Sequence, residues 1–423
     1  MDWRPPHRAP LALPAPWPAC AQGLFRAGAA WLHTGLDRPG EVGGDLLALP
    51  GGPVLETRWE RGHWRTRRDG HPVGGSPWEA LQAFSAEGLP LLGAATFELA
   101  CSEAGHAFQP PTEGALGQRW SAVRQALRVQ GGEAEHWTWN PSADPPALGA
   151  ACSLGRLAFD LRPRWWAPRH GAALREAQAR IHEGGFYVAN LCVPFEGRFE
   201  GDPVTLALAA FRRARPPFGA FLPWGDPTLL CLSMERLLAR RGSRIWTEPI
   251  KGSVPLDTPP GALAADPKEK AEHTMIVDLQ RNDLGRVSVA GSVHVPRLRV
   301  EEDYPTVRHL VSRVEGELRP GTPLPDILRA LLPGGSVTGA PKHAVCAWLA
   351  ATEAGPRGFY CGALGWIHPD GDFDLCMPIR TAQIQDGRLT YWAGGGITRR
   401  SEAAREWEEL HLKTRALTQI MSS

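Results

Sequence analysis

Two pairs of glutamates have the spacing of helix neighbours, and together they could bind a metal ion. Glu406 and Glu409 are three residues apart, four residues before Lys413, and Glu269 and Glu272 are also three apart. Residues at this spacing share one face of a helix. Two helices that each offer two carboxylates could hold one hard divalent cation, which suits Mg²⁺ better than zinc. The same spacing also fits solvated helix surfaces, so spacing alone leaves both interpretations open.

Lysine is scarce in this sequence, and one lysine is a second candidate for a chemical role. Only five of the 46 basic Lys and Arg residues are lysine, and Lys251 lies in the segment Pro249 to Ser253, at the end of a predicted strand. Gly252 permits close approach of the backbone to a ligand, and the Ser253 hydroxyl can donate a hydrogen bond. Lysine, unlike arginine, can lose its proton and attack carbon. Codon bias, or simple pairing of Lys251 with a carboxylate, is the alternative explanation.

Two glycine-rich segments could cradle an anion. Ala393 to Gly396 precedes the last predicted helix, and Pro333 to Lys342 is a polar loop that leads into another. A glycine turn at a helix entrance exposes backbone N–H groups to carboxylates or phosphates. Neither segment has the GxxxxGK[ST] pattern, and GxGxxG is absent, which argues against a nucleotide site.

The elements that must position these residues follow from periodicity and turn signals. Helices are predicted at 168–183, 267–280, 341–352 and 401–420. Strands are predicted at 186–199, 228–238, 243–250, 287–295, 358–367, 373–385 and 388–393, with a surface loop at 133–146. Strands joined by tight turns, with helices inserted, predict an α+β protein with antiparallel sheets covered by helices.

Length and composition set the remaining bounds. The 423 residues, 43% of them hydrophobic, are ample for a sizeable core, and a formal charge of +1 argues against nucleic-acid binding. No apolar run is long enough for a spanning helix, so no membrane is expected. Eight cysteines without a CxxC pair, and prolines within the apolar stretch at 9–21, favour a reduced, cytoplasmic enzyme. The signals sharpen after residue 150, which divides an N-terminal region, 1–150, from a catalytic region, 151–423.

Taken together, the motifs from about residue 151 to 420 resemble those of the chorismate-utilising enzymes, which include anthranilate, aminodeoxychorismate, isochorismate and salicylate synthases. The motifs occur in family order. They are Ser233-Met234-Glu235, Pro249 to Ser253, Lys268 to Arg286, His309 to Ser312, Pro333 to Lys342, Ile379-Arg380-Thr381 and Ala393 to Lys413. The resemblance implies a fold of two antiparallel sheets packed as a sandwich with helices outside, in which residues 1–150 are interleaved with the main fold.

The resemblance also implies a site for one chorismate and one Mg²⁺. Glu272 and Glu409 would touch the metal, and Glu269 and Glu406 would hold it through water. Glu235 matches the family's general acid. The residues implied for substrate binding are Ser253, His309, Thr338, Tyr360, Arg380, Gly394, Gly395, Gly396 and Lys413.

The third residue of the PIxG motif is the branch point within the family. Anthranilate synthases resemble this chain but usually carry alanine there, whereas aminodeoxychorismate synthases usually carry lysine, as at Lys251. The implied mechanism is covalent: a neutral Lys251 amine attacks C2, and ammonia then replaces the C4 hydroxyl. This requires a lowered lysine pKa. Isochorismate and salicylate synthases carry a water-activating lysine where this chain has Val188, and aminating members often carry glutamine there.

Three functions remain in competition. Aminodeoxychorismate synthase component I, which serves 4-aminobenzoate and folate synthesis, leads because of Lys251. Anthranilate synthase component I and a non-catalytic chorismate-binding subunit are the alternatives. No cysteine lies in a glycine-flanked GxCxG elbow, so ammonia is expected from solution or from a separate glutaminase partner.

Overall fold

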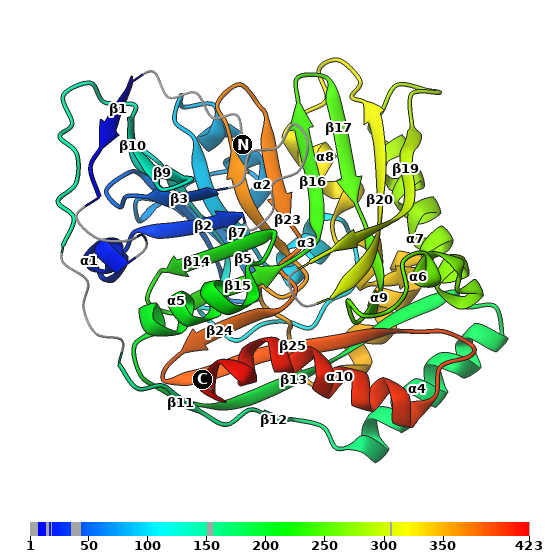
Figure 1. Ribbon diagram of the computed structural model, residues 1–423. Coiled ribbons are helices and arrows are strands. Elements are labelled where there is room, and N and C mark those ends of the chain that lie inside the picture. The colour runs from blue at the N-terminus through cyan, green and yellow to red at the C-terminus, as the bar shows by residue number, and fades with distance from the viewer. Residues whose placement is uncertain are drawn as a thin grey trace.

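The computed structural model consists of two large antiparallel sheets with helices on their outer faces (Figure 1). It describes residues 7–13, 17, 19–34, 44–149, 155–304 and 307–422. Parts of the apolar stretch at 9–21, the predicted boundary near residue 150, and Cys152 therefore lie outside the described residues.

The first sheet has 13 strands among the described residues. In spatial order they are β1 (His7–Leu11), β10 (Glu133–Thr138), β9 (Gln125–Gln130), β3 (Gly44–Ala48), β2 (Ala30–Thr34), β14 (Phe218–Pro223), β15 (Thr228–Ser233), β24 (Thr381–Gln385), β25 (Arg388–Ile397), β13 (Val188–Glu200) and β11 (Ala158–Phe159). Two short strands, β12 (Arg162–Pro163) and β21 (Gly339–Ala340), also pair with β13.

The second sheet has 12 strands in the same described ranges. They run in the order β18 (Ile250–Val254), β20 (Arg308–Glu317), β17 (Arg244–Glu248), β16 (Arg236–Arg241), β23 (Phe373–Cys376), β22 (Ala363–Ile367), β7 (Leu91–Ala95), β8 (Leu116–Ala122), β4 (Val54–Glu60), β5 (His63–Arg68) and β6 (His71–Pro72), with β19 (His294–Asp303) beside β20.

The helices are distributed along the chain between these strands. They are α1 (Gln22–Arg26), α2 (Pro77–Ser85), α3 (Phe97–Glu103), α4 (Ala167–His182), α5 (Pro203–Ala214), α6 (Ala262–Ala265), α7 (Pro267–Gly285), α8 (Leu324–Leu331), α9 (Lys342–Thr352) and α10 (Ala403–Thr418), with 3₁₀ turns at Ala19–Ala21, Gly335–Val337 and Gln419–Ser422. None of the helices in the described part combines the length and the apolar character that crossing a bilayer requires.

The hydrophobic core has the layers of a sandwich. One cluster lies between the sheets, where Leu222 and Leu229 of the first sheet meet Ala94 and Leu364 of the second. Separate clusters pack helices against the outer face of each sheet. The predicted α+β sandwich with external helices is therefore confirmed. The seven described cysteines are all buried and form no disulfide.

The N-terminal region contributes to both sheets. Strands β1, β2, β3, β9 and β10 form one end of the first sheet, and β4 to β8 form one end of the second. Two antiparallel pairings join them to the rest: β2 pairs with β14, and β7 pairs with β22. The surface loop predicted at 133–146 is wrong in its first half, because those residues form β10.

Most predicted helices are confirmed, and their capping explains where they begin. The Asp266 carboxylate accepts hydrogen bonds from the backbone N–H groups of Lys268 and Glu269, and Pro267 occupies the first turn of α7. The helix continues to Gly285, beyond the predicted end at 280. The strand predicted at 287–295 is wrong: that segment is mostly turns, and the strand β19 begins at His294.

Two strands that were predicted to be continuous change sheets part-way. The segment 228–238 divides into β15 of the first sheet and β16 of the second, with Met234 and Glu235 between them. The segment 373–385 divides in the same way into β23 and β24, and the crossing residues include Arg380 at φ +53°. The strands on both sides of each crossing are mostly buried, so a largely apolar sequence continues through the break and hydrophobicity alone does not reveal it.

The inter-sheet layer yields a stability prediction. Leu229 is fully buried between the sheets, so Leu229→Ala should lower the free energy of unfolding by about 2–5 kcal/mol through lost burial and the cavity left behind. Urea denaturation would measure this. Leu298→Ala, at a side chain that is 45% exposed on β19, is the control and should change stability little. Equal effects at the two positions would contradict the assigned packing.

Candidate active site

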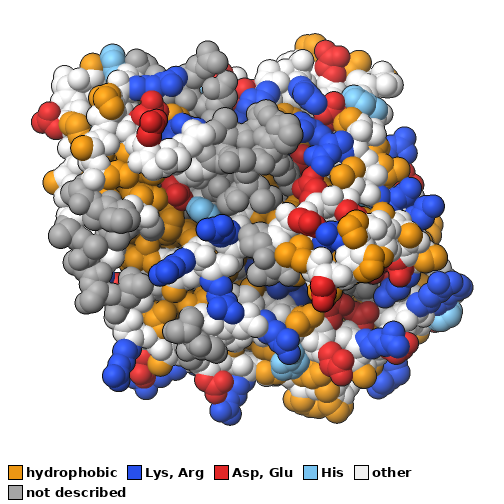
Figure 2. Space-filling model, viewed as in Figure 1, with side chains coloured by type: hydrophobic (Ala, Val, Ile, Leu, Met, Phe, Trp, Pro, Cys, Tyr) orange, Lys and Arg blue, Asp and Glu red, His pale blue; other side chains and the backbone are white. Residues whose placement is uncertain are grey.

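The predicted site residues gather around one cavity of about 850 Å³. Its walls come from β18, α7, α10, β25, the two sheet crossings and the 3₁₀ turn at Gly335–Val337. In the space-filling view, acidic side chains gather at the hollow between the regions of α7 and α10 (Figure 2). The predicted residues that line the cavity are Glu235, Lys251, Ser253, Glu269, Glu272, His309, Tyr360, Arg380, Gly394, Gly395, Gly396, Glu406, Glu409 and Lys413.

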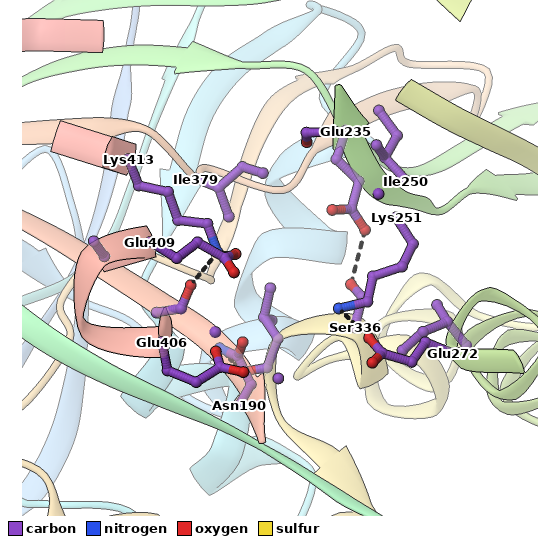
Figure 3. A pocket seen from close by; sticks show the side chains of 18 of the residues that line it. Asn190, Glu235, Ile250, Lys251, Glu272, Ser336, Ile379, Glu406, Glu409 and Lys413 are labelled. Carbon is purple, nitrogen blue, oxygen red and sulfur yellow. Dashed lines mark hydrogen bonds and ion pairs between the residues drawn. The ribbon is translucent and has the colours of Figure 1, made fainter. Parts of the chain in front are cut away.

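The two glutamate pairs lie on different walls of this cavity. Figure 3 shows Glu272 on one side and Glu406 and Glu409 on the other. On α10, Glu409 is 2.6 Å from the Lys413 ammonium, which holds the pKa of Glu409 low against the opposing effect of burial. Burial raises the pKa values of Glu269 and Glu406. On α7, one carboxylate oxygen of Glu269 is buried and has no hydrogen-bond partner.

The donor set fits a hard cation such as Mg²⁺. All four side chains offer carboxylate oxygens, and the unpartnered Glu269 oxygen is the kind of group that a metal satisfies. Glycine makes room for them: a Cβ at Gly252 would come within 2.8 Å of Glu269 Oε2, and one at Gly395 within 2.9 Å of Glu406 Oε2. Within the described ranges, no three acidic, His or Cys side chains converge as a complete ligand set. The two pairs remain apart.

Lys251 enters the cavity from β18 and contacts the acidic wall of α7. Its ammonium lies 2.9 Å from Glu272 Oε2 (Figure 3). Burial lowers the pKa of Lys251, but Glu272, Glu269 and Glu409 together outweigh burial and raise it. The covalent mechanism requires a lowered lysine pKa, and the carboxylates around Lys251 have the opposite effect.

Glu235 has the environment of a proton donor. Its side chain is only 5% exposed, because Met234 and Glu235 cross between the two sheets. The Ser336 hydroxyl donates a hydrogen bond of 2.7 Å to Glu235 Oε1 (Figure 3). Burial raises the pKa of Glu235 to about 7, although Ser336 and Lys251 act in the other direction. A carboxyl group with this pKa can hold or release a proton at neutral pH.

His309 presents an uncharged ring to the cavity. Burial lowers the pKa of His309 to about 4, so the imidazole is neutral at physiological pH. Its Nδ1 is 2.8 Å from the Gly252 carbonyl and 2.9 Å from the Ser253 hydroxyl. Because a carbonyl only accepts, we assign the proton to Nδ1. The buried Nε2, which has no partner, is then an acceptor.

Arg380 lies in the crossing just before β24, and it approaches Lys413 of α10. The Arg380 guanidinium donates to the Lys413 carbonyl at 2.8 Å. The Lys413 ammonium donates to the Gly394 carbonyl at 2.6 Å, in addition to its ion pair with Glu409. Both cations line the cavity and could bind carboxylates.

Two sequence-based expectations need correction. The glycines 394–396 do not form a turn, because they lie in β25 and pair with β13, Gly395 opposite Leu191. A paired strand engages alternate amides, so only part of this segment can face a ligand. Thr338 does not line the cavity: it is fully buried, and its hydroxyl donates to the Gly334 carbonyl within its own loop.

Several cavity residues were not predicted from the sequence. Ser336 belongs to the glycine-rich loop that was singled out, but nothing in the sequence connects it to Glu235. Trp392, whose ring stacks on Tyr360 with centroids 6.3 Å apart, and Asn190 carry no motif signal. The pairing of β13 with β25 brings Asn190 and Trp392 to the site, since one residue lies on each strand.

A sequence model of the chorismate binding enzymes matches residues 80–419 of this chain. The chain belongs to the chorismate-binding enzyme family. The match extends 70 residues further toward the N-terminus than the resemblance that begins near residue 151, which agrees with N-terminal strands in both sheets.

The similar proteins include both aminodeoxychorismate synthases and anthranilate synthases. Aminodeoxychorismate synthase component 1 of Salmonella typhimurium is 39% identical over 265 residues, which is 60% of this chain and 58% of that protein. The Escherichia coli protein of the same name is 38% identical over 260 residues, 60% of this chain and 57% of that protein. Anthranilate synthase component 1 of Pseudomonas putida is 40% identical over 228 residues, 52% and 46% respectively. The chain thus matches less than two thirds of the length of these relatives.

Solved structures share the fold over more of the chain. Anthranilate synthase component I of Streptococcus pneumoniae superposes with a TM-score of 0.77 at 25% identity, covering 90% of this chain and 93% of that one. The menaquinone-specific isochorismate synthase of Escherichia coli superposes with a TM-score of 0.72 at 18% identity, covering 98% and 94%. The latter supports the fold alone.

The buried Glu235 leads to a pH prediction. Its pKa is about 7 in the folded chain against an ordinary 4.5, so the folded state retains a proton that the unfolded state has lost. The stability that this proton contributes is complete below pH 4.5 and is lost as the pH rises through 7. The unfolding free energy of the wild type minus that of Glu235→Gln should therefore fall by about 2.5 kcal/mol between pH 5 and pH 8.

Urea denaturation at several pH values would measure this difference. Glu98, whose pKa burial also raises to about 7, is present in both proteins, so its contribution cancels. A difference that does not change with pH would contradict the raised pKa of Glu235.

Proposed function

We propose that the chain is component I of an aminodeoxychorismate synthase, which replaces the C4 hydroxyl of chorismate with ammonia to give 4-amino-4-deoxychorismate. The observation that carries the proposal is Lys251. It occupies the third position of the PIxG motif and reaches into a cavity that also contains a carboxyl group with a pKa near 7. Percent identity does not distinguish an aminodeoxychorismate synthase from an anthranilate synthase, since relatives of both classes are about 40% identical to this chain.

The residues of the cavity suit a substrate with two carboxylates. Arg380 and Lys413 are the cations placed to bind them on the α10 side. Glu269, Glu272, Glu406 and Glu409 would hold Mg²⁺. When bound, the metal would neutralise a substrate carboxylate and offset the acidic charge that raises the pKa of Lys251. The neutral His309 offers an acceptor to a hydroxyl or amine of the substrate.

The proposed chemistry has two balanced steps. The neutral Lys251 amine forms a bond to ring C2, the two ring double bonds shift, and the C4 hydroxyl takes a proton from Glu235 and departs as water. Ammonia then bonds to C4, the double bonds shift back, and Lys251 leaves C2 as a neutral amine. The extra proton on the new C4 nitrogen returns to the Glu235 carboxylate, which restores the acid. The sum is chorismate plus ammonia giving aminodeoxychorismate plus water. A covalent intermediate divides one difficult substitution into two easier ones.

Ammonia must reach C4 from outside the cavity. We infer that a separate glutaminase subunit supplies it, because the chain carries no nucleophile elbow of the GxCxG type. The word component in the names of the relatives is consistent with a two-subunit enzyme.

Anthranilate synthase is the second candidate, favoured by the relative from Pseudomonas putida and by the superposition on the Streptococcus pneumoniae enzyme. Lys251 argues against it. A non-catalytic subunit is disfavoured, since burying acidic groups in one cavity costs free energy that a scaffold does not need to spend. Water addition at C2 is disfavoured because Val188, a cavity residue, cannot act as a base.

Product analysis tests the proposal. With chorismate, Mg²⁺ and ammonium at mildly alkaline pH, we expect a non-fluorescent product that retains the enolpyruvyl group and carries an amine in place of the hydroxyl.

Lys251→Ala should reduce formation of this product at least a hundredfold, and some anthranilate could then appear. Lys270→Ala, on the exposed face of α7, is the matched control and should retain full activity. Anthranilate and pyruvate from the wild type would overturn the assignment, and unchanged amination by Lys251→Ala would overturn the covalent role.

The metal assignment has its own test. Glu409→Ala should abolish Mg²⁺-dependent turnover and weaken Mg²⁺ binding, measured by calorimetry, because one of the two carboxylates that would touch the metal is lost. Glu402→Gln, at an exposed residue before α10 that pairs with Arg405, is the control and should leave both unchanged. A Glu409→Ala variant that responds normally to Mg²⁺ would show that the ligand assignment is wrong.

A further inference from the structure

A buried arginine lies behind the cavity and does not line it. The side chain of Arg357 is 1% exposed, and its guanidinium is held by both carboxylate oxygens of Glu353, at 2.7 and 2.8 Å. The guanidinium also lies over the ring of Phe97, 4.4 Å from the centroid. The backbone N–H groups of residues 357 and 358 donate to the Glu98 carboxylate. Arg357 is therefore fixed from several sides.

The remaining donors of Arg357 connect two walls of the cavity. One guanidinium nitrogen donates to the Val337 carbonyl at 2.8 Å, and another donates to the Asn190 carbonyl at 2.9 Å. The side-chain amide of Asn190 donates to the same Val337 carbonyl at 3.1 Å, and its backbone N–H donates to Thr338 at 2.7 Å. The glycine-rich loop is thus fastened to β13 at Val337, with Arg357 behind both.

Val337 directly follows the residue that contacts the candidate general acid. Ser336 and Val337 belong to one short 3₁₀ turn, and the Ser336 hydroxyl donates to Glu235 at 2.7 Å (Figure 3). A turn of three residues has few independent torsions, so fixing the Val337 carbonyl restricts where the Ser336 hydroxyl can lie. The path from Arg357 to Glu235 needs only the two neighbouring residues Val337 and Ser336.

We propose that Arg357 is a positioning residue for Glu235, acting through the Val337 carbonyl and the Ser336 hydroxyl. This inference rests on the proposed function only in taking Glu235 as the acid. If Arg357 had only a structural role, its substitution would change the stability of the protein without a specific effect on the chemical step. A positioning arginine lowers kcat more than it changes KM, and it does so only while Ser336 is present to transmit its effect.

A double-mutant cycle separates the two roles. Arg357→Lys and Ser336→Ala should each lower kcat for chorismate consumption about tenfold, with KM within about twofold of wild type. The double variant should be no more than about twofold slower than the slower single variant, because both changes break the same path. Multiplied effects, a hundredfold loss in the double variant, would overturn the proposal. The control is Arg329→Lys, at an ion-paired arginine on α8 outside the cavity lining, which should leave kcat unchanged with or without Ser336→Ala.

Chorismate consumption does not depend on which product forms, so a wrong product assignment would leave the cycle interpretable. A crystal structure of Arg357→Lys provides a measurement that requires no turnover: the distance between the Ser336 hydroxyl and Glu235 should exceed 3.5 Å. If that variant does not fold, Glu353→Gln, which weakens the hold on Arg357, takes its place in both measurements. A contact that remains at 2.7 Å would overturn the proposal.

Discussion

The site depends on the chain crossing twice between the two sheets at the same place. The hydroxyl of Ser233 donates to the Met377 carbonyl at 2.6 Å, and the backbone N–H of Met377 donates to the Glu235 carbonyl at 3.0 Å. These bonds tie one crossing to the other. As a result, the Glu235 carboxyl group is buried away from solvent at the first crossing. The second crossing brings Arg380 to the cavity.

Charge balance is the second organising feature of the cavity. The acidic walls of α7 and α10 each have a lysine as counter-ion, Lys251 at Glu272 and Lys413 at Glu409. The cations therefore compensate for carboxylates that would otherwise repel one another across the cavity. The same compensation keeps Lys251 charged, so its reactivity depends on what else occupies the acidic walls.

The sequence predicted the parts of the site that depend on local spacing. The glutamate pairs follow from helix periodicity, and Lys251 follows from a short motif at a strand end, so these residues needed no tertiary information. Ser336, Asn190 and Arg357 could not be predicted, because the contacts that connect them to the site join residues from 20 to 167 positions apart in the chain. The two sheet crossings were missed for a related reason: an apolar sequence indicates that a strand is buried but does not identify the sheet to which it belongs. Thr338 matched a motif, yet its hydroxyl is used within its own loop.

The placement of the N-terminal strands bears on how this protein can be divided. The residues proposed to be catalytic all come after residue 230, which suggests a separable catalytic fragment. However, β2 covers one edge of β14, and β7 covers one edge of β22. A fragment that began after residue 150 would expose two unpaired strand edges, one in each sheet, along with the apolar layer between the sheets. Such edges template association with other chains, so the first 150 residues act as a built-in guard against aggregation.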